Sequence, residues 1–91
     1  MTNQLTAQRP RRRPGSSLRK VEHGAVLHTV APEGMVVLNP TALALWELCD
    51  GHTLVEEMVA AVCDLFAVTE ERARADVHRA LADMRSRGAI T

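Results

Sequence analysis

Asn39 and Pro40 divide this 91-residue chain into two halves that favour different backbone structures. In the first half, β-branched residues recur in three segments that are separated by two turn signals, His23-Gly24 and Ala31-Pro32-Glu33-Gly34. Short β-branched segments separated by such turns are typical of antiparallel strands. The predicted strands run from about Leu18 to Glu22, from Ala25 to Val30 and from Met35 to Leu38.

The second half of the chain predicts three helices, because each of its apolar segments begins with capping residues. Asn39 can accept hydrogen bonds from free backbone N–H groups, and Pro40 suits a first helical turn, where its missing N–H has no partner. The second helix is predicted to begin at the capping box Thr53-Leu54-Val55-Glu56. The third is predicted to begin at Thr69, with acidic residues in its first turn, and to end near Arg87-Gly88.

Each predicted helix carries apolar residues at a spacing of three and four, which predicts a buried stripe. The stripes are Ala42, Leu45, Trp46 and Cys49 in the first helix, Val55, Met58, Val59, Val62, Leu65 and Phe66 in the second, and Ala73, Val77, Ala80, Leu81 and Met84 in the third. Three strands followed by three helices with short links predict an α+β fold, a three-stranded antiparallel sheet with the helices packed on one side.

The formal net charge of zero conceals an uneven distribution. Residues 1–20 hold six of the eleven basic residues and no acid, so five basic residues remain against all eleven acids in the rest of the chain. Residues 1–17 are polar and basic, with Pro, Gly and Ser, and are predicted to form a flexible tail, which leaves residues 18–91 as the folded domain. An acidic domain argues against duplex DNA binding. The less favoured alternative to a flexible tail is a tail that holds a partner or nucleic acid.

The sequence offers little support for catalysis, for a metal or for a cofactor. The four histidines are scattered, and Cys49 and Cys63 are fourteen residues apart, which is not a metal-ligand spacing. Neither a nucleotide-binding glycine motif nor a clustered nucleophile, base and acid is present. With only two cysteines and no signal peptide, the sequence predicts a cytoplasmic protein. It has no apolar run of about 20 residues, so we expect that it does not enter a membrane.

Binding is the remaining class of function, and the third strand is the candidate surface. Met35, Val36, Val37 and Leu38 contain none of the charges or prolines that usually protect a sheet edge, so a peptide could add there as a fourth strand. The third helix could form a wall beside that edge, with Arg72, Asp76 and Arg79 on its polar face selecting acidic side chains of the peptide. The alternative for these three residues is an ordinary solvated helix face.

The segment LNPTALALWELCDGHTLVEEMVAAV, together with Asp76-Val77, Leu81 and Arg87-Gly88-Ala89-Ile90, resembles PqqD-like proteins. These proteins, also called RiPP recognition elements, hold the leader part of ribosomally made precursor peptides. The resemblance covers about residues 21–90 and implies a winged helix-turn-helix fold. It implies that a leader peptide adds to the strand Met35 to Leu38 and packs against the helix at Arg72, Asp76 and Arg79, while a modifying enzyme, often a radical SAM protein, binds elsewhere.

The sequence and the resemblance together predict a non-enzymatic adaptor that binds a leader peptide and delivers it to a modifying enzyme. Two alternatives stay open: a winged-helix regulator that binds DNA, and a small subunit that stabilises a larger enzyme. An open strand edge also allows a homodimer.

Overall fold

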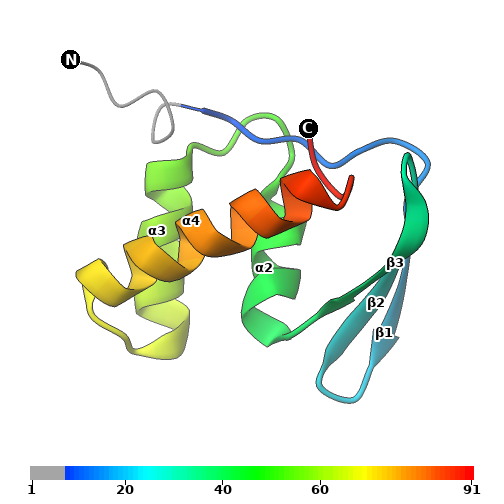
Figure 1. Cartoon of the computed structure of the whole chain (residues 1–91). Helices are drawn as coiled ribbons and strands as arrows, with labels where there is room; N and C mark the ends of the chain where they lie inside the picture. The colour runs from blue at the N-terminus through cyan, green and yellow to red at the C-terminus, as the bar shows by residue number, and fades with distance from the viewer. Residues whose placement is uncertain (1–7) are drawn as a thin grey trace.

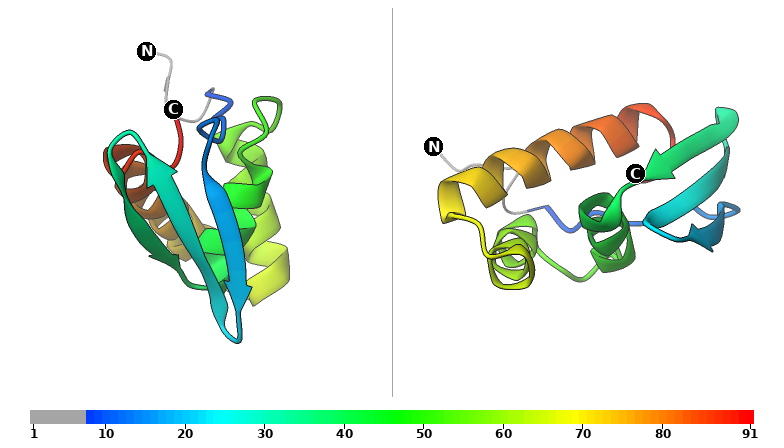
Figure 2. Two further views of the ribbon diagram at one scale, coloured as in Figure 1. Left: turned by 90° about the vertical axis from the view of Figure 1, so that its right-hand side faces the viewer. Right: turned by 90° about the horizontal axis from the view of Figure 1, so that it is seen from below.

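Three antiparallel strands are followed by three helices in the computed structural model, which describes residues 8–91 (Figure 1). The strands are β1 (Ser17–Val21), β2 (Gly24–Val30) and β3 (Glu33–Leu38), and the helices are α2 (Pro40–Leu48), α3 (Val55–Phe66) and α4 (Glu70–Ser86). α4 crosses over α2 and α3, and the sheet lies beside α2 at the C-terminal end of α4 (Figure 2). The predicted fold class and element order are confirmed.

The sheet has the order β1-β2-β3, so β3 is an edge strand. The register pairs Leu27 with Val36 and Ala25 with Leu38, which places the four side chains on one buried face. Alternate residues of the same strands, such as Val37 with an exposed fraction of 78%, lie on the opposite face towards solvent. Side chains of β3 therefore fix the strand to the core while its outer backbone edge remains unpaired within residues 8–91.

Capping residues begin two of the helices as predicted. The Asn39 side chain accepts from the Ala42 N–H at 2.8 Å, with Pro40 in the first turn. The Thr69 hydroxyl accepts from the Arg72 N–H at 3.2 Å. Each bond satisfies one of the backbone donors that a helix start leaves free.

The predicted cap of the second helix is wrong by one residue. α3 begins at Val55, and Leu54 is the N-cap, whose N–H donates to the Glu57 side chain at 2.9 Å. Thr53 lies one residue before this cap, and its N–H and its hydroxyl both donate to the Asp50 carboxylate, at 2.8 and 3.0 Å. The glutamate half of the capping box is therefore made one residue later than predicted, while Thr53 is held in an Asx turn by Asp50.

The hydrophobic core consists of the inner sheet face and the apolar stripes of the helices. Most of the predicted stripe residues are buried or packed against this core. Leu65 and Phe66 are the exceptions, with exposed fractions of 65% and 37%, because α3 extends past α4 at its C-terminal end. The predicted buried stripe of α3 is therefore wrong for its last two members.

Cys49 lies in the core at the end of α2, and its Sγ contacts the carbonyl oxygen of Leu45 at 3.2 Å. Burial raises the pKa of the Cys49 thiol to about 11. The group is therefore a neutral thiol at physiological pH, which suits a packing role and opposes a nucleophilic one.

Residues 8–16 form an extended strap, which joins the segment between α2 and α3 to the C-terminal residues of the chain (Figure 1). The Arg12 N–H donates to the carbonyl of Cys49 at 2.7 Å, the Arg13 N–H donates to the carbonyl of Ala89 at 3.1 Å, and the Thr91 N–H donates to the carbonyl of Arg11 at 2.9 Å. Such contacts differ from the flexible tail expected as far as residue 17. The predicted domain boundary between residues 17 and 18 stays a prediction, and residues 1–7 of that tail lie outside the described residues.

Within the strap, Arg12 binds the C-terminal end of α2. Its guanidinium donates to the carbonyl of Glu47 at 2.6 Å and lies 5.5 Å from the centre of the Trp46 ring. The indole N–H of Trp46 in turn donates to the carbonyl of Ala89 at 3.2 Å. A cation at the negative end of the helix dipole, stacked on an aromatic ring, joins the strap, α2 and the C-terminus.

We expect Gly24→Ala to destabilise the fold much more than Gly34→Ala, its matched control in the same hairpin. Gly24 has a φ of 130°, and a Cβ there would overlap the carbonyl oxygen of Leu38. A Cβ on Gly34 would lie 3.7 Å from the nearest atom, the Thr29 hydroxyl. The first substitution should lower the free energy of unfolding by more than about 2 kcal/mol, the second by less than about 0.5 kcal/mol. Urea titration followed by circular dichroism measures both, and equal stabilities would contradict this account of the β2–β3 packing.

Replacing Arg12 with Ala should lower the free energy of unfolding by about 1–2 kcal/mol, because the helix end loses its charged donor and the Trp46 ring loses the stacked cation. Arg9→Ala removes an equal charge from an exposed position of the strap and is the control. Thermal denaturation of both variants measures the difference. If the two changes have the same effect, Arg12 does not hold the strap to α2.

Candidate functional site

A groove of about 580 Å³ lies between β3 and α4, with the first turn of α2 at its base. Val37, Leu38 and Asn39 line it from the strand side, Thr41 and Ala42 from α2, and Arg72, Asp76, Arg79, Ala80, Asp83 and Met84 from α4. Residues from three separate elements thus meet beside the unpaired edge of the sheet. No other strand of residues 8–91 covers this edge.

The structure brings five of the seven predicted site residues together in this groove: Val37, Leu38, Arg72, Asp76 and Arg79. Met35 and Val36 lie further back on β3, where a smaller hollow of about 250 Å³ continues along the strand. Ser86 and Arg87 line that hollow from the end of α4. The two hollows follow β3 on one side and α4 on the other.

The length of β3 limits how many residues of a peptide could bind along its edge. β3 has six residues, which span roughly 20 Å at a rise of about 3.3 Å per residue. From Arg72 to Arg87, α4 covers a similar distance at about 1.5 Å per residue. An extended peptide segment of about six residues therefore matches the combined length of the hollows.

Three charged side chains of α4 form a connected group at one end of the groove. Arg72 Nε and Arg79 Nη1 each lie 3.3 Å from a carboxylate oxygen of Asp76. The Asp76 side chain is 25% exposed, whereas those of Arg72 and Arg79 are 71% and 76% exposed. Asp76 therefore orients both guanidinium groups, and most of each remains open to solvent.

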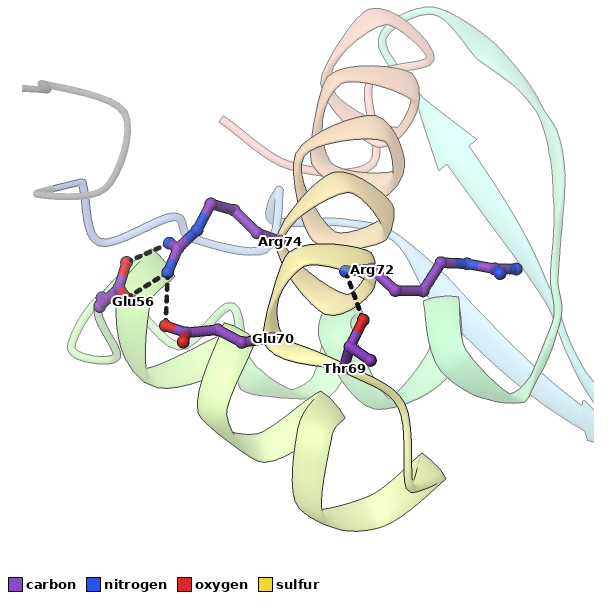
Figure 3. Close-up of polar contacts among 5 residues, drawn as sticks. All are labelled: Glu56, Thr69, Glu70, Arg72 and Arg74. Carbon is purple, nitrogen blue, oxygen red and sulfur yellow. Dashed lines mark hydrogen bonds and ion pairs between the residues drawn. The ribbon is translucent and has the colours of Figure 1, made fainter.

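Arg74, in contrast, is part of the structure that holds α3 against α4. Its guanidinium donates to both carboxylate oxygens of Glu56, at 2.7 and 2.9 Å, and to Glu70 at 2.8 Å. The hydrogen bond from Arg74 lowers the pKa of Glu56 below its usual value. Figure 3 shows Arg74 and Arg72 extending from opposite sides of α4, so only Arg72 reaches the groove.

Sequence reasoning missed the base of the groove. Thr41, Ala42, Ala80, Asp83 and Met84 line it. The sequence predicts only a buried stripe for Ala42, Ala80 and Met84, and Thr41 and Asp83 are not among the predicted site residues. Ala42 and Ala80 carried the available signal, because a small residue on an apolar stripe leaves space above it. The spacing of a stripe cannot distinguish an alanine under a partner helix from one under an open groove.

Within residues 8–91, no helix is long and apolar enough to cross a bilayer. The same part of the chain contains no group of three or more His, Cys, Asp or Glu side chains placed to hold a metal ion.

Solved structures with the same fold are found over almost the whole chain. Lasso peptide synthetase B1 complexed with the leader peptide matches with a TM-score of 0.75 and 23% identity, over 91% of this chain and 98% of that one. TbiB1 in complex with the TbiA(beta) leader peptide matches with a TM-score of 0.76 and 16% identity, over 88% and 93% of the two chains. At these identities the two likenesses establish the fold.

A third solved structure is the PqqD truncation of Methylobacterium extorquens PqqCD, described as a functional and stand-alone RiPP recognition element. It matches with a TM-score of 0.71 and 26% identity, over 90% of this chain and 87% of that one. The comparison with curated proteins finds no match. The family model for coenzyme PQQ synthesis protein D (PqqD) matches residues 27–90, more than two thirds of the sequence, and the chain therefore belongs to the PqqD family.

Proposed function

We propose that this protein is a non-catalytic adaptor that binds the leader of a ribosomally made precursor peptide and presents it to a modifying enzyme. The observation that carries the proposal is the groove beside the unpaired edge of β3. Family membership supports it, as do the leader peptides named in two of the similar structures. The finer part of the proposal is that the enzyme is a radical SAM protein and that both act in the cytoplasm.

In this proposal the leader adds to β3 as a fourth strand. Met35, Val36, Val37 and Leu38 supply backbone donors and acceptors, and alternate peptide side chains enter the hollows beside α4. Each backbone hydrogen bond contributes only about 0.5–1.5 kcal/mol net, so a six-residue edge alone gives weak and unselective binding. The walls of the groove, including Arg72, Asp76 and Arg79, therefore supply the selectivity.

The adaptor role rests on bringing two molecules together. A bound leader brings its precursor to the enzyme, which raises the local substrate concentration without any reaction on the adaptor itself. Domains that capture a substrate in this way need a surface for the peptide and a second surface for the enzyme. Neither requires a nucleophile or a cofactor.

The alternative of a DNA-binding regulator is less well supported by the charges of α4. Three of its four arginines, at 72, 74 and 79, lie within salt-bridge distance of carboxylates of the same protein, as does Arg87 at its C-cap. The fourth, Arg85, donates to the Gln8 side chain at 3.4 Å. Phosphate contacts would have to compete with these pairs, whereas duplex binding draws its affinity from neutralising phosphates.

Filling the groove should abolish peptide binding. A randomised twelve-residue peptide library, selected on the wild-type protein, provides the ligands. Ala80→Trp places a large ring in the groove and should weaken binding of the selected peptides by more than about tenfold, or about 1.4 kcal/mol. Ala60→Trp makes the same change at an exposed position of α3 and is the control. Thr41→Trp fills the same groove from α2 and provides a second variant for the test if Ala80→Trp folds poorly. Selected peptides that bind both groove variants normally would overturn the proposal.

Strand addition should protect the backbone amides of β3. On addition of a selected peptide, hydrogen exchange in residues 33–39 should slow by about tenfold or more, since outward N–H groups gain partners and the strand opens less often. The other edge of the sheet, β1 (Ser17–Val21), is the internal control and should exchange as before. Protection of β1 in place of β3 would show that the peptide uses the wrong edge for this mechanism.

A further inference from the structure

The charges along the groove are not uniform, and their distribution bears on which peptides the groove can accept. At the end nearest α2, the guanidinium groups of Arg72 and Arg79 share one carboxylate, that of Asp76. Two positive charges and one negative charge leave this end with an excess of one positive charge. The first turn of α2, at Thr41 and Ala42, lies at the same end and adds the positive end of a helix dipole.

The balance of charge reverses further along the groove, towards the start of β3. Asp83 and Arg87 form an ion pair with 3.0 Å between Nε and Oδ1. Glu33 lines the smaller hollow beside Arg87. One positive and two negative charges therefore lie between Asp83, which lines the larger groove, and Glu33 at the start of β3. Glu33 is roughly 20 Å from the end at Leu38 by the length of the strand.

Binding of a peptide changes the environment of these charges. A strand on β3 would exclude water from the side of Arg72 and Arg79 that faces the groove, and a guanidinium that loses water without gaining a partner is unfavourable. A carboxylate of the peptide could accept hydrogen bonds from both arginines, whose orientation Asp76 already fixes. Beneath them, Ala42, Ala80 and Met84 offer an apolar surface for a neighbouring side chain.

We infer that the peptide recognised by this groove carries an Asp or Glu side chain opposite Arg72 and Arg79, next to an apolar side chain that packs on Ala42, Ala80 and Met84. This inference rests on the proposed function and specifies its substrate class. The acidic residue sets the register of the peptide on β3, because a shift towards Glu33 would bring it to the negatively charged end.

The test is a double-mutant cycle with peptides from the randomised library selected on wild-type protein. We expect Asp or Glu to be enriched at one position beside an apolar residue. In a selected peptide, replacing that acid with its amide should weaken binding about two- to fivefold, the range of an exposed ion pair. Arg79→Gln should weaken binding of the acidic peptide by a similar factor and leave binding of the amide peptide almost unchanged.

Two further variants make the test specific. Asp76→Asn removes the negative charge that competes with the peptide carboxylate but keeps an amide oxygen that can accept from the guanidinium groups, so it should strengthen binding of the acidic peptide. Arg19→Gln removes the same charge as Arg79→Gln from an exposed position of β1 and should leave binding unchanged. The contribution of Arg79 should also shrink between low salt and about 0.5 M salt.

The outcomes separate the inference from the proposed function. Peptides that lose binding to Ala80→Trp but show no acidic enrichment would overturn the inference and leave the adaptor role intact. Acidic peptides weakened equally by Arg19→Gln and Arg79→Gln would also overturn it, since only the total charge would then matter. If no selected peptide depends on the groove at all, both the inference and the proposed function are wrong.

Discussion

The structure depends on how β3 ends. Leu38 is buried in the core, and its backbone carbonyl lies so close to position 24 that only a glycine fits there. The next residue, Asn39, caps α2, so no flexible link separates the strand from the helix. Burial of Val36 and Leu38 on one face, with a helix starting at once, fixes the strand without a fourth strand beside it. The same junction positions the first turn of α2 at the base of the groove, which is why the site and the core cannot be separated.

Local signals were sufficient to predict most of the fold. The turns, the β-branched segments and the caps at Asn39 and Thr69 act over three or four residues, and the structure contains all of them. Thr53 is not the cap because it is held in a turn by its two bonds to Asp50, three residues earlier, and a pattern does not rank a local turn against a cap. The strap at residues 8–16 could not be predicted, since its partners Cys49, Ala89 and Thr91 are far away in the sequence and its composition is that of a tail.

Prediction of the candidate site depended on two kinds of information. Edge chemistry pointed to β3 and the charged face of the third helix pointed to α4, and the family resemblance implied the same strand and helix. Neither could show that Val37 and Leu38 lie in the larger hollow while Met35 and Val36 lie in the smaller one, because this depends on where α4 crosses the strand. The ion pairs of Arg72 and Arg79 with Asp76 could not be predicted either, since side chains three and four residues apart on a helix can pair with each other or point into solvent.

An unpaired strand edge usually invites association with other sheets, and the geometry around β3 opposes this. Another sheet approaching the edge would have to pass α4, whose charged side chains Arg72, Asp76, Arg79, Asp83 and Arg87 stand along the groove. A flat apolar strand would take water from these groups and supply no partners for them, which is unfavourable. A single extended peptide is narrow enough to enter between β3 and α4 and can carry side chains that match the charges. Under the proposed function, the wall that α4 forms would therefore serve two purposes, protecting the edge from other sheets and selecting among the peptides that reach it.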